Sequence, residues 1–379
     1  MDDRQNCSKD EAFDPALIAT VRLAMVPGVG PATRRALFEV FASAEEILAA
    51  PPSRLREVPG VGATLARRIV AACDEIDVET QLELCRRSGV MLLTEQSSQY
   101  PRLLREIHDP PAILFVRGNL LPEDALSVAV VGTRHCSHYG RQTAERLAAG
   151  LARAGLTIVS GLARGIDAVA HQGAMKAGGR TLAILGSGVL NIYPPEHVSL
   201  ADQVIGSGAV ISENPPTSEP MTGSFPQRNR VITGMTLGVI VVEAGERSGA
   251  LISARHAMEQ GREVFAVPGR VDSRTSRGCH RLIRDGAKLV ETVEDVLEEL
   301  GPLVEATPQP DGRVIHHPAE LQLNDQERLV LEAIDTEPIS IDAVAITSGL
   351  PIQRVLATLS VLEMRHLVRR VSGNLVMRK

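Results

Sequence analysis

The chain has 379 residues, which is long enough for two or three domains and at least one sizeable hydrophobic core. Hydrophobic residues make up 44% of it, and glycine and proline are spread along the chain, so the composition is that of a globular protein and excludes a disordered one. The net charge of −6 at pH 7 excludes a uniformly basic nucleic-acid coat, so any polyanion site must be a local patch.

The N-terminal segment is polar and acidic where a signal peptide carries a basic and then an apolar run. No run of about 18 apolar residues occurs in the sequence. We therefore expect a cytoplasmic protein with no membrane partner. The five cysteines show neither CxxC nor Cys/His ligand spacing, which predicts reduced thiols and no metal.

An internal repeat begins the folded chain. The sequence VPGVG at residues 26–30 returns at residues 58–62, and each copy precedes a helical pattern with two adjacent arginines. A helix, a Gly-x-Gly turn and a second helix form a helix-hairpin-helix, whose free amides suit a phosphate. Residues 1–88 are therefore predicted to be a tandem helix-hairpin-helix domain. Such hairpins also pack or bind protein, so a secondary DNA contact is one of two open alternatives for Gly28, Gly30, Gly60 and Gly62.

Residues 89–300 alternate short apolar runs with amphipathic ones. Continuous β-branched runs separated by helices predict a doubly wound, Rossmann-like α/β fold with a mostly parallel sheet. A ligand of such a sheet lies beyond the carboxyl ends of its strands. The predicted strands are 127–132, 156–160, 181–185, 209–212, 239–243, 263–267 and 288–291.

The C-terminal part contains a linker and a small domain. Residues 301–319 hold four prolines and are predicted to be the linker. Residues 320–379 show three helical patterns and a hairpin, which predicts a winged helix. From Arg354 onward this domain has six basic residues and one acidic residue, and both DNA binding and protein binding fit that pattern.

The predicted strand ends share glycines, small hydroxyls and arginines, which open backbone amides and place charged forks for phosphate oxygens. Residues 224–234, SFPQRNRVITG, add two arginines, an asparagine and an aromatic ring. We interpret these segments as walls of one polyanion site. The candidate DNA-binding residues are Gly132, Arg134, Ser160, Gly161, Arg164, Gly186, Phe225, Arg228, Asn229, Arg230 and Ser248.

Signatures of nucleotide cofactors and of catalysis are missing from the sequence. It has no Gly-Lys pair for a Walker A loop and no GxGxxG after the first predicted strand, so we expect no cofactor. Asp167 and His171, four residues apart, resemble a base with its orienting partner, but a helix cap and a packed histidine explain them better. We therefore expect a protein that is not an enzyme.

The motifs VAVVGTR, SGLARGID, LGSGVLNIYP, SFPQRNRVITG and VEAGERSGALISARHAMEQG together resemble the DNA-processing protein DprA (Smf) family over about residues 100–290. The resemblance implies a homodimeric single-stranded DNA-binding protein that protects incoming DNA in natural transformation and loads the RecA recombinase onto it. It also implies that Arg134, Phe225, Arg228, Asn229 and Arg230 line the strand's path, with Arg164 a further candidate.

An enzymatic alternative comes from the same sheet, which also resembles nucleotide phosphoribohydrolases of the lysine-decarboxylase-like group. Their PGGxGTxxE signature is absent from this sequence. Single strands are held by a charged groove and by ring stacking, and Phe225, Arg228 and Arg230 are predicted to supply both parts in one loop. We therefore expect preferential binding of single strands, and we expect Arg134→Ala and Arg228→Ala to weaken it with little loss of folding.

Overall fold

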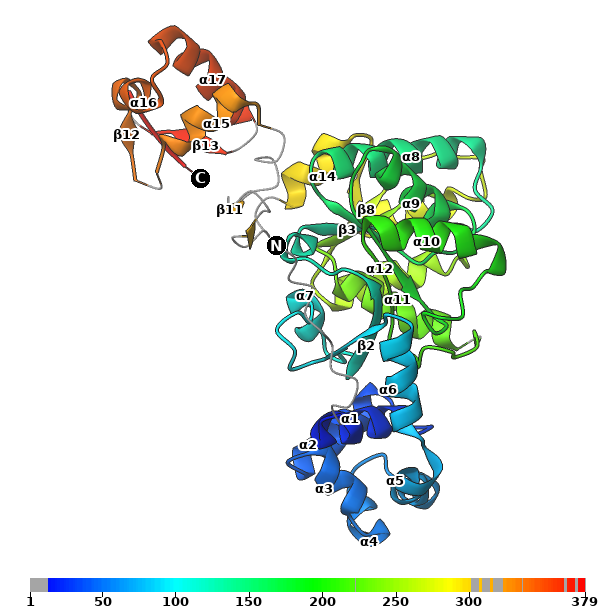
Figure 1. The fold of residues 1–379 in the computed structure, drawn as a ribbon. Helices are drawn as coiled ribbons and strands as arrows, with labels where there is room; N and C mark the ends of the chain where they lie inside the picture. The colour runs from blue at the N-terminus through cyan, green and yellow to red at the C-terminus, as the bar shows by residue number, and fades with distance from the viewer. Residues whose placement is uncertain are drawn as a thin grey trace.

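The structure is a computed structural model that describes residues 13–221, 223–300, 307–308, 314–315, 323–335, 337–364, 367–371 and 374–378. Figure 1 shows a blue helical domain, a central sheet layered between helices, and a separate orange and red C-terminal domain. This arrangement confirms the predicted α/β fold with a helix-hairpin-helix domain and a winged helix.

The N-terminal domain is built from the predicted repeat. Gly28 and Gly60 adopt φ angles of 98° and 84°, a left-handed conformation that favours glycine, and each turn leads into a helix. Gly30 and Gly62 then stand at the N-caps of those helices. The helices are α1 (Pro15–Met25), α2 (Pro31–Val40), α3 (Ala44–Ala49), α4 (Pro52–Leu55), α5 (Ala63–Glu75) and α6 (Val78–Arg87).

The central sheet has the strand order β1-β2-β6-β5-β4-β3-β7-β8-β9, and the seven strands from β6 to β9 run parallel. The first two strands, which the sequence analysis did not predict, run antiparallel at one edge. The strands are β1 (Met91–Thr94), β2 (Ile113–Gly118), β3 (Ser127–Val131), β4 (Thr157–Ser160), β5 (Thr181–Leu185), β6 (Ala209–Ser212), β7 (Gly238–Val241), β8 (Glu263–Ala266) and β9 (Lys288–Leu289).

Helices cover both faces of this sheet, because alternate side chains of each buried strand point to opposite layers. In β3, Val128 and Val130 pack beneath α8 (His138–Arg153) and α9 (Ile166–Lys176), whereas Ala129 and Val131 pack beneath α11 and α12. The remaining helices are α7 (Arg102–Arg105), η1 (Pro122–Ala125), η2 (Pro195–His197), α10 (Val198–Ser207), α11 (Ser224–Gly234), α12 (Ala250–Glu259), α13 (Arg277–Arg284) and α14 (Val293–Leu300).

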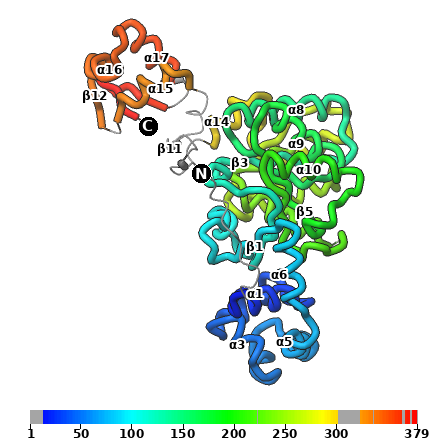
Figure 2. Tube along the Cα trace, viewed as in Figure 1, coloured from blue at the N-terminus to red at the C-terminus, as the bar shows by residue number. Residues whose placement is uncertain are grey.

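The hairpin domain and the sheet share a hydrophobic core. Val21 of α1 and Leu82 of α6 are buried in one cluster with Phe115 of β2 and Ala183 of β5. Figure 2 shows α6 running from the hairpin helices up to the sheet. This core fixes the hairpin domain against the edge of the sheet that contains β2.

The C-terminal domain consists of α15 (Asp325–Glu332), β12 (Ile339–Ser340), α16 (Ile341–Ser348), α17 (Ile352–Met364), β13 (Val368–Arg370) and β14 (Leu375–Arg378). Three helices and an antiparallel sheet of order β12-β14-β13 make the predicted winged helix. Most of the predicted linker, 301–319, lies outside the described residues. Within it, β10 (Thr307–Pro308) and β11 (Val314–Ile315) form a short antiparallel pair.

No single helix among the described residues is long and apolar enough to cross a membrane. Helices α16 and α17 pass that test of length and composition only as a pair bent by 107°. Val344, Val355 and Leu359 of this pair are buried in the core of the winged helix.

The shared core predicts that Leu82→Ala lowers the free energy of unfolding by about 3 kcal/mol, because it leaves a cavity between α6 and the sheet. Chemical denaturation measures this change. Val70→Ala, at an exposed position on α5, is the control and should cost far less. Equal losses for the two variants would contradict the shared core.

Candidate nucleic-acid interface

The ends of three adjacent parallel strands bring the predicted glycines together. Because β5, β4 and β3 are neighbours, Gly186, Gly161 and Gly132 follow one another along the carboxyl edge of the sheet. A Cβ at Gly132 would lie 2.6 Å from Cγ1 of Ile166. The glycines therefore let neighbouring elements approach the strand ends closely.

Residues 224–234 were interpreted as part of a loop, and that interpretation is wrong because they form the helix α11. Pro226 is compatible with a helix here because it lies in the first turn, where backbone amides have no intrahelical partner. The helical period then sends the side chains of this segment to different faces. Phe225 and Arg228 face the strand ends, whereas Arg230 faces the loop that precedes β2.

Phe225, whose ring is half-buried, forms the centre of a cluster at these strand ends. Its ring lies over Gly186, where a Cβ would be 3.1 Å from Cδ1 of the ring. The ring of Tyr193 lies 5.7 Å away between centroids, tilted by 47°, and Cζ of Arg134 lies 5.4 Å from the Phe225 centroid. We call Arg134, Tyr193 and Phe225 the Phe225 cluster.

Arg134 supplies the charge of the Phe225 cluster. Its side chain is exposed, and within the described part of the chain it makes no hydrogen bond or ion pair. A cation stacked on an aromatic ring and open to solvent can contact a phosphate while the ring contacts a base. This is the chemistry expected at a single-strand site.

The sequence analysis missed two residues of this surface. Tyr193 follows β5 in the motif NIYP, and its signal was its rarity, since the chain has only nine aromatic residues. Arg247 is exposed in the loop after β7, beside the predicted Ser248, and has no ion pair among the described residues. Both residues lie in motifs of the family resemblance, LGSGVLNIYP and VEAGERSGALISARHAMEQG, but those motifs did not mark them as contacts.

Arg228 is buried and bonded inside the protein. Its Nη1 donates to the carbonyl oxygen of Gly161 at 2.6 Å and to that of Ile184, so it joins the ends of β4 and β5 to α11. Burial lowers the pKa of Arg228 to about 10, while the nearby Asp167 carboxyl opposes that shift, so the guanidinium stays charged at neutral pH. Its substitution must therefore disturb folding, which differs from the expectation drawn from sequence.

Arg230 is also buried, and acidic partners meet its charge. Nη1 donates to the carbonyl oxygen of Asp109 at 2.6 Å, Nε lies 3.2 Å from Oδ2 of the same residue, and Nη2 donates to Glu213. Burial raises the pKa of Glu213, and the guanidinium of Arg230 opposes that rise. These contacts tie α11 to the segment before β2.

The other predicted residues differ in accessibility. Ser160 is fully buried and donates to the carbonyl oxygen of Val130 at 2.6 Å. Arg164 is exposed but pairs with Glu196. Asn229 and Ser248 are half-buried, and their side-chain bonds are weak, at 3.5 Å to Gly249 and 3.3 Å from Ala250.

Asp167 and His171 are both buried and do not bond each other among the described contacts. Asp167 accepts bonds from the amides of Gly161 at 3.1 Å and Ala163 at 3.4 Å, so it closes the turn before α9 instead of capping the helix. His171 packs as expected, with Nδ1 2.7 Å from Oγ1 of Thr181. The Thr181 hydroxyl donates to Ile158, so His171 donates from Nδ1.

The two hairpin turns have different surroundings. The first turn faces the central domain across a crevice lined by Val29, Gly30 and Pro215, with a volume of about 70 Å³. Around the second turn, Cβ atoms built at Gly60 and Gly62 would meet nothing within 4 Å. The second turn is thus the more open of the two.

A Rossmann-like sheet with two half-buried rings and an exposed cation at its strand ends, joined to tandem hairpins and a winged helix, is the architecture of a DNA-processing protein. Residues 91–301 match the family described as DNA recombination-mediator protein A, residues 315–374 the DprA winged helix domain, and residues 21–75 the SAM-like helix-hairpin-helix tandem. The chain belongs to the DNA-processing protein DprA (Smf) family, which confirms the resemblance drawn from its motifs.

Individual relatives extend this match. Protein Smf of Synechocystis is 32% identical over 378 residues, which cover 92% of this chain and 95% of that protein. The X-ray structure of DprA from Streptococcus pneumoniae aligns with a TM-score of 0.64 and 36% identity, covering 74% of this chain and 97% of that one. A Helicobacter pylori DprA structure, whose subject is its single-stranded DNA binding mode, aligns with a TM-score of 0.51 and 29% identity over 56% of this chain and 97% of that one.

The burial of Arg228 predicts that Arg228→Ala lowers the free energy of unfolding by about 3 kcal/mol. The change removes the donor of two strand-end carbonyls and the cation beside Asp167. Denaturant titration measures the loss, with the exposed Arg134→Ala as the matched control, which should change stability little. A loss for Arg228→Ala no larger than for the control would contradict this role.

Because His171 is buried, the free energy of unfolding is expected to depend on pH. Burial lowers its folded pKa from 6.5 to about 3, so between these values only the unfolded chain takes up the proton. Stability from this group is therefore complete above about pH 6.5 and falls by about 1.4 kcal/mol per pH unit below it. His171→Gln should flatten the stability profile measured between pH 7 and pH 5, and an unchanged slope would refute the assignment.

Proposed function

We propose that this protein binds single-stranded DNA along the carboxyl ends of β5, β4 and β3. The observation that carries the proposal is the Phe225 cluster, in which one exposed cation stacks on a ring beside a second ring. Single strands need these two parts, a positive charge for the backbone and an aromatic face for the bases. A chain with net charge −6 attracts DNA only through such a local patch.

Each candidate residue has a role in this proposal. Arg134 contacts phosphates, the exposed Arg247 adds positive charge from the loop after β7, and Arg164 contributes once a phosphate replaces Glu196 as its partner. Phe225 and Tyr193 stack on bases, and Asn229 and Ser248 offer polar atoms at the end of β7. Arg228 and Arg230 do not contact the strand but hold α11 in place. The buried guanidinium of Arg228 also covers strand-end carbonyl oxygens that would repel phosphate.

The proposed activity is binding of the DNA strand, without cleavage of its bonds. Asp167 and His171, the pair that resembled a catalytic base with its orienting partner, make their hydrogen bonds inside the protein. On this reading the protein is not an enzyme and needs no cofactor. Its task is to protect strands and deliver them to another protein.

The biological setting rests on family membership. We propose that the protein acts in the cytoplasm as a homodimer, protects incoming strands in natural transformation, and loads the RecA recombinase onto them. The Helicobacter pylori relative, studied for its single-stranded DNA binding mode, supports the strand as the ligand. The hairpin glycines and the winged helix are proposed as secondary contacts with DNA or protein.

Fluorescence anisotropy with labelled single strands and duplexes tests the proposal. The full chain should prefer the single strand, and its affinity should fall steeply between about 50 mM and about 200 mM salt as phosphate neutralisation is screened. Arg134→Ala should weaken binding about tenfold and lower the salt slope by about 0.7. Phe225→Ala should cost about 1 to 3 kcal/mol of binding energy through lost stacking.

Arg153→Ala is the matched control, because Arg153 is an exposed arginine at the far end of α8, whose N-terminus follows the Arg134 loop. It should leave affinity and salt slope unchanged. Equal affinity for single strand and duplex, or binding that ignores salt, would reject the proposal. If Arg134→Ala weakened binding but Phe225→Ala did not, charge alone would hold the strand.

A further inference from the structure

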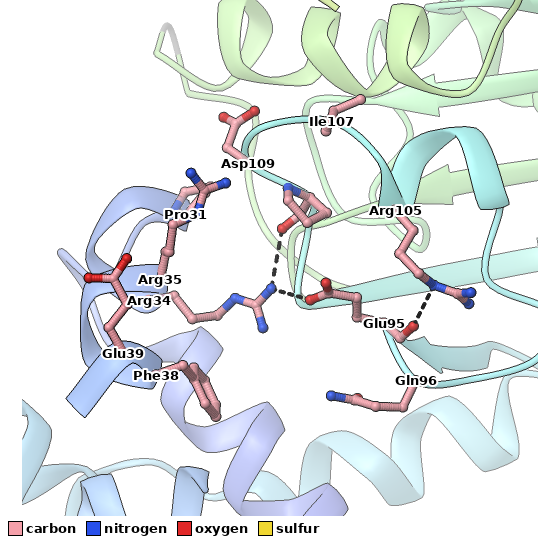
Figure 3. Close-up of a pocket in the computed structure, with 11 residues that line it drawn as sticks. Pro31, Arg34, Arg35, Phe38, Glu39, Glu95, Gln96, Arg105, Ile107 and Asp109 are labelled. Carbon is pink, nitrogen blue, oxygen red and sulfur yellow. Dashed lines mark hydrogen bonds and ion pairs between the residues drawn. The ribbon is translucent and has the colours of Figure 1, made fainter. Parts of the chain in front are cut away.

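A second cleft lies between the hairpin domain and the sheet edge. Its volume is about 830 Å³, and one wall is α2, while the other comes from the segments after β1 and before β2 (Figure 3). Because Thr94 pairs with Ile113 and Phe115 with Ser212, these segments lie at the edge where β6 ends. The cleft therefore opens at the same carboxyl edge of the sheet as the Phe225 cluster.

One ion pair spans this cleft, and the charges of its two members, Arg34 and Glu95, cancel. Arg34 reaches from α2 to Glu95, with Nη2 at 2.5 Å from Oε2, and also donates to the carbonyl oxygen of Pro110 at 3.4 Å (Figure 3). Asp109, another residue of the wall, is bound by Arg230. The carboxylates of Glu95 and Asp109 are thus already engaged.

Two arginines of the cleft keep an unneutralised charge. Arg35 donates to the imidazole of His108 at 2.7 Å, and Arg105 donates to the carbonyl oxygens of Glu95 at 3.0 Å and Ser97 at 2.9 Å. Neither has a carboxylate partner in the part of the chain that the structure describes. None of these three acceptors is a carboxylate, so each guanidinium is held in place while no carboxylate neutralises its positive charge.

An exposed aromatic ring, Phe38, also lines this cleft. Phe38 of α2 is 38% exposed, and the Arg34 guanidinium lies 5.7 Å from its ring centroid. As at Phe225, a guanidinium lies over the ring, but here that guanidinium belongs to Arg34, which is paired with Glu95, so the free charge comes from Arg35 and Arg105. Glu39, four residues after Arg35 on α2, also lines the cleft, and Figure 3 shows its side chain pointing away from Glu95 and Arg105.

The cleft is connected to the Phe225 cluster through α11 and the loop after β6. Arg228 of α11 bonds the ends of β4 and β5. Two residues further along the same helix, Arg230 binds Asp109 of the cleft and Glu213 of that loop. Pro215 of the same loop lines the crevice against the first hairpin turn. A strand that leaves Phe225 across this loop arrives at α2.

We propose that the cleft is a second contact for the same single strand, in which Arg35 and Arg105 bind phosphates and Phe38 stacks on a base. This inference rests on the proposed function, because it extends the path of the strand held by the Phe225 cluster. It gives the first hairpin a role different from insertion of its turn into DNA. Its second helix presents Arg35 and Phe38, while its turn faces the central domain across the crevice that Gly30 and Pro215 line.

Oligonucleotide length separates the two contacts. Oligothymidylates of about 6 nucleotides fill the strand ends only, whereas those of about 20 also reach the cleft. The full chain should bind the longer strand more tightly. Arg35→Ala and Phe38→Ala should each weaken binding of the longer strand about tenfold and leave the shorter one unchanged. Both side chains are exposed, so thermal denaturation should show retained folding.

Arg87→Ala, at an exposed arginine at the end of α6, is the control and should bind both lengths like the unmodified protein. Unchanged binding of the longer strand by Arg35→Ala and Phe38→Ala would overturn the inference. So would equal weakening at both lengths, which places the effect at the strand ends. Failure of the unmodified protein to bind either length would instead reject the proposed function itself.

Discussion

The contact of the Arg228 guanidinium with the carbonyl oxygens of Gly161 and Ile184 positions the rest of the site. A buried cation needs its bonds, because without them the desolvation of its charge is uncompensated. Meeting that requirement fixes α11 across the ends of β4 and β5. The position of every other side chain on that helix follows from this contact.

One end of α11 places Phe225 over Gly186, where Tyr193 and Arg134 meet its ring. Two residues beyond Arg228, Arg230 binds Asp109 and Glu213 and so anchors the wall of the hairpin-domain cleft. Both arginines of α11 are buried, so the helix itself exposes little charge. The arginines of residues 224–234 thus organise two exposed surfaces without being part of either.

The sequence predicted the sheet well, because parallel strands buried on both faces read as continuous apolar runs, as Ser127–Val131 does. It did not reveal β1 and β2, which are antiparallel edge strands outside that pattern. It predicted the hairpins and the winged helix from glycine spacing and helical periods. The prediction for residues 224–234 failed because proline and polar residues suggested a loop, although a proline in a first turn is compatible with a helix.

The candidate site was predictable by place and less so by role. The strand-end glycines and Arg134 lie at the carboxyl edge of the sheet, but a sequence shows a charge without its partner. Asp109, which neutralises Arg230, is 121 residues away in the chain, and Gly161 is 67 residues from Arg228. Burial of Ser160 and the contact of Tyr193 with Phe225 likewise depend on tertiary packing that no local motif encodes.

Photocrosslinking of the full chain to single strands carrying 5-iodouracil, followed by peptide mapping, tests the central claim most directly, because it locates the bases on the protein. The account predicts crosslinks at Phe225 and Tyr193, the two rings of the Phe225 cluster. Crosslinks confined to the winged helix or to the second hairpin turn, with none at these rings, would contradict it.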